Sequence, residues 1–77
     1  MAHYFFDLRN SFDINDEEGR DCDDLEAAKA CAVAEARQVA SDDVLAGSLD
    51  TSHRINVRDA DGEVVASVTF GEAVKVS

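Results

Sequence analysis

Basic residues are scarce in this chain of 77 residues. Seven Lys and Arg stand against 17 Asp and Glu, which gives a formal net charge of −10. This charge opposes direct binding to nucleic acid or to an anionic membrane, and it favours basic partners, cations or plain solubility. No apolar run approaches the ~20 residues that span a bilayer, and the first residues lack the features of a secretory signal. We therefore expect a cytoplasmic protein that contacts neither membranes nor nucleic acid directly.

Cysteine and histidine are scarce as well, with two of each. No Cys-x-x-Cys is present, so we expect reduced thiols, no metal and no cofactor. A helix that starts at Asp24 places Cys31 about 10 Å along its axis, too far for an easy bridge to Cys22. Neither His3 nor His53 lies in a recognisable nucleophile context, and only a spatial pairing of His53 with one of the thiols stays open. We expect no catalytic residue and no enzymatic activity.

Large apolar side chains are few, so the hydrophobic core must be thin. Four Phe, one Tyr and one Met are the largest of them. A chain of this length forms one domain, residues 1–77, near the lower limit of what folds alone. Domains of this size often gain stability from a partner subunit, so we expect a homodimer.

Alternation of apolar and polar residues predicts strands near both ends of the chain. Residues 4–8 form a first strand, with Phe5 turned away from the core. A short second strand is expected around residues 11–15 or 20–22. Residues 55–70 predict a β-hairpin whose tight turn contains Asp61-Gly62.

A long helix is predicted from near Asp24 to Ala40. Asp23 and Glu26 have the spacing of a capping box, and the residues that follow are nearly all good helix formers. One side of this helix carries mostly small apolar residues, which favours a helix lying flat on a sheet. These residues are Leu25, Ala28, Ala32, Ala36 and Val39. Residues 42–52 are expected to form a loop.

The predicted fold is α+β, a small antiparallel sheet of three or four strands with one long helix on one face, in the order β(β)αββ. The other face of the sheet is then uncovered. Phe5 and Val65 are expected there, with Phe12 a further candidate. A second copy of the chain would cover them, so these residues are the predicted dimer interface.

Residues 13–26 carry the densest charge, with eight acids against Arg20 alone. This segment is a solvated loop that caps the helix, a docking surface for a basic protein, or a divalent-cation loop. An EF-hand is excluded, because Gly19 comes one residue too late. We expect a non-enzymatic interaction domain that docks a basic protein, and a small-ligand or divalent-cation module is the alternative. The predicted partner-binding residues are Asp13, Asp16, Glu17, Glu18 and Asp21.

Five short motifs are spread along the chain: Tyr4-Phe5-Phe6, Asp16-x-x-Gly19, Asp24-Leu25-x-Ala27-Ala28, Val57-x-Asp59-x-x-Gly62 and Val68-x-Phe70. Together they resemble a family of small uncharacterised alphaproteobacterial proteins, rhizobial ones especially. The resemblance covers nearly the whole chain and implies a bacterial cytoplasmic setting, but no activity and no site. Members often carry His where this chain has Asp7. The second and third motifs are also similar, more loosely, to small antitoxin-type domains with a partial ribonuclease-H-like fold, which implies an antitoxin-like regulator as a further alternative.

Overall fold

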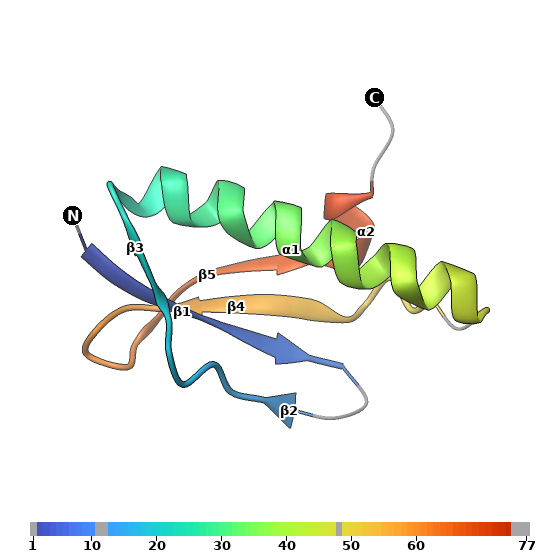
Figure 1. The fold of residues 1–77 in the computed structure, drawn as a ribbon, viewed down its shortest axis with the longest axis horizontal. Helices are drawn as coiled ribbons and strands as arrows, with labels where there is room; N and C mark the ends of the chain where they lie inside the picture. The colour runs from blue at the N-terminus through green and yellow to red at the C-terminus, as the bar shows by residue number, and fades with distance from the viewer. Residues whose placement is uncertain (1, 11–12, 48, 75–77) are drawn as a thin grey trace.

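An antiparallel sheet with one long helix packed on it forms the fold, which confirms the predicted α+β class (Figure 1). The computed structural model describes residues 2–10, 13–47 and 49–74. Phe12 therefore lies outside the described residues. The elements are β1 (Ala2–Arg9), β2 (Asp13–Ile14), β3 (Arg20–Cys22), α1 (Leu25–Ala46), β4 (Arg54–Arg58), β5 (Val64–Thr69) and α2 (Phe70–Ala73).

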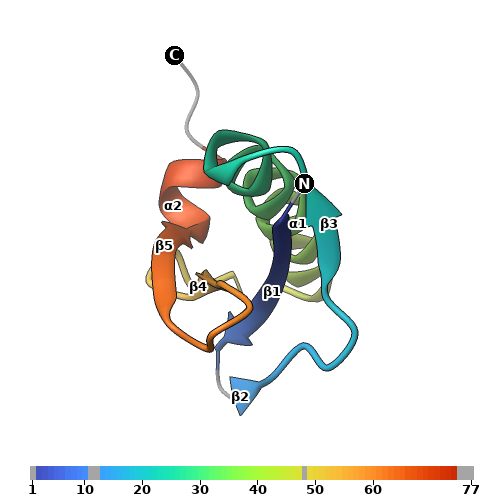
Figure 2. The ribbon, with the colours of Figure 1, turned by 90° about the vertical axis from the view of Figure 1, so that its left-hand side faces the viewer.

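Strand β1 organises the sheet, because it is paired along both of its edges. One edge pairs with β4, which in turn pairs with β5. The other edge is shared, with β3 opposite Ala2 to Tyr4 and β2 opposite Leu8 and Arg9. Both candidate positions for a short second strand are therefore strands, and together with β1, β4 and β5 they make a five-stranded sheet. Viewed from the end of the molecule, β5 and β3 lie on opposite sides (Figure 2).

Helix α1 lies flat across one face of the sheet, as its small side chains predict. Small residues let the helix backbone approach the strands closely. Ala40, one position beyond the expected Val39, completes the buried stripe, and Leu25 and Val39 are only partly buried. The core that α1 covers includes these larger residues: Tyr4, Phe6, Ile55, Val57, Val68 and Phe70.

The helix differs from the prediction at both ends. Asp24, and not Asp23, is the N-cap, because its carboxylate accepts a hydrogen bond of 2.8 Å from the Ala27 N–H. The predicted loop from residue 42 was wrong in its first turn, since α1 continues to Ala46. No proline or glycine interrupts the helix before Gly47, whose φ of 77° closes it in the left-handed conformation that glycine favours.

The hairpin between β4 and β5 forms as predicted, but the pairing of its strands contains a bulge that was not predicted. Gly62 has a φ of 88°, and the Asp59 carboxylate accepts from the Asp61 and Glu63 N–H groups. A bulge then shifts the pairing, so that Arg58 faces Val64 while Val57 faces Ala66. The extra residue, Val65, lies beside α1 rather than on the open face.

The chain after β5 corrects a second detail of the predicted hairpin. Phe70 was expected to end the strand, but it begins α2, which Thr69 caps through the Glu72 N–H. Phe70 is nevertheless fully buried in the core. The Arg37 guanidinium donates a hydrogen bond of 2.6 Å to the Ala73 carbonyl, which ties α2 to α1.

Candidate functional site

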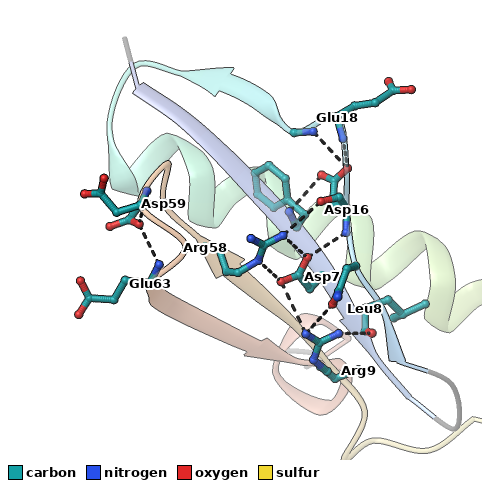
Figure 3. A network of polar contacts seen from close by, with 12 residues as sticks. Asp7, Leu8, Arg9, Asp16, Glu18, Arg58, Asp59 and Glu63 are labelled. Carbon is teal, nitrogen blue, oxygen red and sulfur yellow. Dashed lines mark hydrogen bonds and ion pairs between the residues drawn. The ribbon is translucent and has the colours of Figure 1, made fainter.

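Asp7 is a fully buried carboxylate on the face of the sheet that α1 leaves open, with 0% of its surface exposed. The Arg58 guanidinium donates to both of its oxygens, and the Asp16 N–H donates to Oδ1 at 2.9 Å (Figure 3). Burial alone would raise the pKa of Asp7, but these hydrogen bonds and the charges of Arg58 and Arg9 outweigh it and lower the pKa. Asp7 alternates along β1 with Phe6, which is in the core, so its side chain lies on the open face, where Arg58 and the adjoining loop bury it.

Asp16 fills the gap that β2 and β3 leave along the edge of β1. Its Oδ2 accepts from the Phe6 N–H at 3.1 Å, in place of a neighbouring strand. Its Oδ1 accepts from the N–H groups of Glu18 and Gly19. Burial raises the pKa of Asp16, but the three backbone donors outweigh it, so the pKa is lowered. Asp16 therefore holds in place the loop between β2 and β3, residues 15–19, which we call the acidic loop.

His3 is the second anchor of the same loop. Its Nδ1 lies 2.6 Å from Asp21 Oδ1, and its Nε2 lies 2.8 Å from the Glu18 carbonyl oxygen. Both neighbours are acceptors, so only the protonated ring satisfies both contacts. The hydrogen bonds to Asp21 and to Glu18 raise the pKa of His3. Gly19 is required at this point, because its φ is 70° and a Cβ there would lie 2.5 Å from His3 Nε2.

The anchored loop and α1 border an open groove of about 550 Å³, which we call the acidic groove. Its apolar lining includes the partly buried Leu8 and Ile14, whose surface is 55% exposed. Exposed carboxylates of Glu17, Glu18 and Glu35 form its rim. All the residues that line the groove are Phe6, Leu8, Ile14, Asn15, Asp16, Glu17, Glu18, Gly19, Arg20 and Glu35.

Two charged residues set the electrostatics of the acidic groove. Partial desolvation raises the pKa of Glu35, while the charge of Arg20 opposes that rise. The Arg20 guanidinium carbon lies 5.8 Å from the centre of the Phe6 ring. A cation thus already rests on an aromatic wall of the groove, which is a favourable position for one.

The five predicted partner-binding residues do not all lie at the acidic groove, and the side chains of two of them form internal hydrogen bonds. Glu17 and Glu18 present to the acidic groove carboxylates that no described residue engages, whereas Asp16 lines the groove but is engaged with backbone donors. Asp21 is engaged with His3, and Asp13 lies on β2 opposite Arg9, away from the groove lining.

Of the residues that line the acidic groove, sequence reasoning singled out Asp16, Glu17 and Glu18 as partner-binding and missed the others, Glu35, Leu8 and Ile14 among them. Glu35 comes from the middle of α1, and Leu8 and Ile14 come from paired strands. Only the tertiary packing of α1 on the sheet brings these residues beside the acidic loop. The sequence carries one signal for this groove. Ile14 is an apolar residue between the polar Asp13 and Asn15.

The predicted dimer residues lie apart from one another. Phe5 is half-buried on the open face, with the His3 ring 5.0 Å away edge-on and the Arg58 guanidinium 4.9 Å from its centre. Its own chain therefore shields much of the ring. Val65 lines a second groove of about 450 Å³ with Lys29 and Val33 of α1.

The two thiols, Cys22 on β3 and Cys31 on α1, lie near enough to influence one another. Burial is the main cause of a raised pKa at Cys22, and the neighbouring Cys31 thiol adds to it. Both cysteines are free. A raised pKa keeps Cys22 protonated, so it is not an activated nucleophile.

Within the described ranges, no group of three or more His, Cys, Asp or Glu is placed to hold a metal ion. Across the same part of the chain, no helix is long and apolar enough to cross a membrane. The His53 ring packs edge-on against Phe70 at 5.8 Å and lies 3.4 Å from Asp50.

Comparison with known families finds one match, which spans most of this fold. Residues 3–71 match the family described as a domain of unknown function, DUF6894. The chain belongs to this family. The match runs from β1 into α2, so the DUF6894 domain includes the acidic groove, the buried Asp7 and the β4–β5 hairpin. No curated protein and no solved structure matches.

Proposed function

We propose that this DUF6894 domain is a non-enzymatic docking module that binds a basic, partly apolar segment of a partner protein in the acidic groove. The observation that carries the proposal is the exposed Ile14 beside three carboxylates that form no ion pair with any residue the structure describes, those of Glu17, Glu18 and Glu35. A groove with an apolar lining and a charged rim suits a partner with the opposite charge at its edge and an apolar side chain at its centre.

Charge complementarity supports a basic occupant. Four carboxylates line the groove against one guanidinium, and the whole chain carries −10. A field of one sign raises the rate at which an oppositely charged partner arrives. Exposed Ile14 and the partly buried Leu8 then offer apolar contact to the side-chain stems of Lys or Arg.

The proposal assigns different tasks to the acids of residues 13–21. Asp16 and Asp21 shape the loop through Phe6 and His3, and Glu17 and Glu18 contact the partner. A variant that removes Asp16 would confound loss of binding with loss of the loop. The sharp variant is therefore E17Q/E18Q/E35Q, because none of its three side chains is needed for an internal hydrogen bond of the described residues.

The experiment is an affinity capture from lysate of the source organism, at low and moderate salt. We expect a basic protein on the wild type, and its loss on E17Q/E18Q/E35Q. The matched control is D42N/D61N/E63Q, which changes net charge equally at exposed positions away from the groove and should retain the partner. Three lost rim interactions of ~0.5 kcal/mol each weaken binding about tenfold. Equal capture by all three proteins, or none by any, would contradict the proposal.

A small-ligand site is the second candidate, because a volume of about 550 Å³ lies within the range of small-molecule pockets. A thermal-shift screen separates the two. A ligand at a hundredfold excess over Kd stabilises the fold by about 2.7 kcal/mol. A hit abolished by E17Q/E18Q/E35Q would favour the ligand candidate over protein docking.

We also propose that the domain works in the bacterial cytoplasm. Support comes from the cysteine content, two residues without a Cys-x-x-Cys motif, which suits a reducing compartment, and from the resemblance of the short motifs to alphaproteobacterial proteins.

A further inference from the structure

The two outer edges of the sheet differ in charge. The edge formed by β2, β3 and the loop between them carries five acids, whereas residues 64–71, which contain β5, carry no charged residue at all. This is the longest run without Asp, Glu, Lys or Arg in the chain. Two copies of a molecule with a net charge of −10 repel one another wherever their acids meet. Close approach of two copies is therefore least opposed at β5.

The backbone of β5 presents hydrogen-bonding groups to that edge. Phe6 donates its N–H to Asp16, so its polar groups point away from β4. Phe6 faces Val57, and Val57 faces Ala66. The backbone N–H and C=O groups of successive residues point to opposite sides of a strand. Those of Val57 therefore point towards β5, and those of Ala66 point towards β4.

The backbone polar groups of the alternate residues, those of Ser67 and the N–H of Thr69, then point away from β4. The N–H and C=O groups of Ser67 and the N–H of Thr69 face the free edge, because β5 pairs only with β4 among the described strands, whereas the Thr69 C=O belongs to the N-cap of α2. The Phe70 N–H, which donates to the His53 carbonyl oxygen at 2.7 Å, fits the same alternation. A strand edge of this kind, with β-branched residues and no charge, is a template for pairing with another strand.

Apolar surface accompanies this edge on both faces of the sheet, at Val65 on the helix side and at Val64, the partner of Arg58, on the open face. Val65 and Val33 line the second groove, and Val64 is 53% exposed. A strand added at β5 would remove part of this surface from water, at roughly 25 cal/mol for each Å².

We propose that a second copy of this chain pairs antiparallel with β5 about a twofold axis near Ser67, which joins the two sheets into one. Such pairing is self-complementary, since each outward N–H meets the carbonyl of the second copy. A face-to-face dimer through the open face would instead bury three guanidinium groups of each copy, those of Arg9, Arg54 and Arg58, with the buried Asp7 carboxylate as the ion-pair partner of Arg9 and Arg58. The β5 edge lies across the sheet from the acidic groove, so the dimer and the proposed docking succeed or fail independently.

Sedimentation equilibrium tests this proposal on the full chain. The wild type should show twice the 8.3 kDa of one chain. Proline is tolerated on an edge strand where the N–H faces outward, so Ser67→Pro should keep the fold and give a monomer. Ser67→Ala, which retains the N–H, should remain dimeric. A monomeric wild type, or a dimer that persists in Ser67→Pro, would overturn the proposal.

Hydrogen exchange provides a measurement that does not depend on how Ser67→Pro folds. In the wild type, the Ser67 and Thr69 amides should exchange about tenfold more slowly at high than at low protein concentration, because only the dimer protects them. The Ala66 and Val68 amides, which face β4, should show no such dependence. Fast exchange of Ser67 and Thr69 at every concentration would rule out pairing at this edge.

Discussion

The buried ion pair between Asp7 and Arg58 should be the most sensitive polar contact in the fold. Asp7→Ala leaves the Arg58 guanidinium without its carboxylate and the Asp16 N–H without its acceptor. Removing one partner of a buried pair costs about 3–5 kcal/mol. Arg58 keeps 27% of its side chain exposed, so water recovers part of its charge and the low end, about 3 kcal/mol, applies. A domain of this size has a total stability of roughly 4–12 kcal/mol, so the loss is large.

Urea denaturation followed by circular dichroism measures this loss. With a slope of about 1 kcal/mol per molar, the midpoint of Asp7→Ala should fall by about 3 M. Asp13→Ala removes an exposed acid and should cost less than about 0.5 kcal/mol. In a double-mutant cycle with Arg58→Ala, the double variant should cost clearly less than the sum of the singles. A loss below about 1 kcal/mol for Asp7→Ala, or strict additivity, would refute the reasoning.

Three further predictions concern the loop, the helix and pH. Gly19→Ala combines a positive φ with a clash against His3 Nε2 and should lower the free energy of unfolding by about 2 kcal/mol, which urea denaturation would detect. Ala36→Leu overpacks the buried stripe and should cost about 1–3 kcal/mol in the same assay, whereas Ala34→Leu on the exposed side should cost little. The pKa of His3 is raised above its ordinary 6.5, so its stabilisation is complete below that value and is lost as pH rises through the folded pKa. The wild type should therefore lose more stability than His3→Gln as pH rises above about 6.5, and equal losses would contradict the His3 assignment. The lowered pKa values of Asp7 and Asp16 act in the opposite direction, since their stabilisation is lost as pH falls below about 3.8 through the folded values, and acid unfolding of the wild type followed by circular dichroism should begin in that range.

Periodicity alone was sufficient to predict the main elements of the fold. The alternation of residues 4–8 and of the β4–β5 hairpin, and the small stripe of α1, confirm that local pattern determines these elements. The end of α1 was mistaken because Asp42 and Asp43 disfavour a helix only weakly, and the stronger signal, Gly47, comes later. The position of Val65 was not predictable, because a bulge of one residue changes the side of the strand without a clear trace in the sequence.

The candidate site could be predicted only in part. The acidic segment was evident from composition, but its division into anchoring and free acids depends on contacts between residues far apart in the chain. Asp16 is engaged because the ladder along β1 has a gap, and Asp21 is engaged because His3 lies opposite it. Glu35 and Ile14 join the site through the packing of α1 and β2, and a single sequence carries no record of that packing.

The central claim is that the acidic groove binds a basic, partly apolar segment, and NMR titration tests it most directly. The probe is a short peptide of alternating Lys and Leu, added to the 15N-labelled wild type, with a Glu-Leu peptide of the same length as the control. We predict saturable shifts at the amides of Leu8, Ile14, Glu17 and Glu35 for the Lys peptide alone, with weaker binding in Ile14→Ser. Shifts spread evenly over all exposed acids, or the absence of any shift at the groove, would contradict the account.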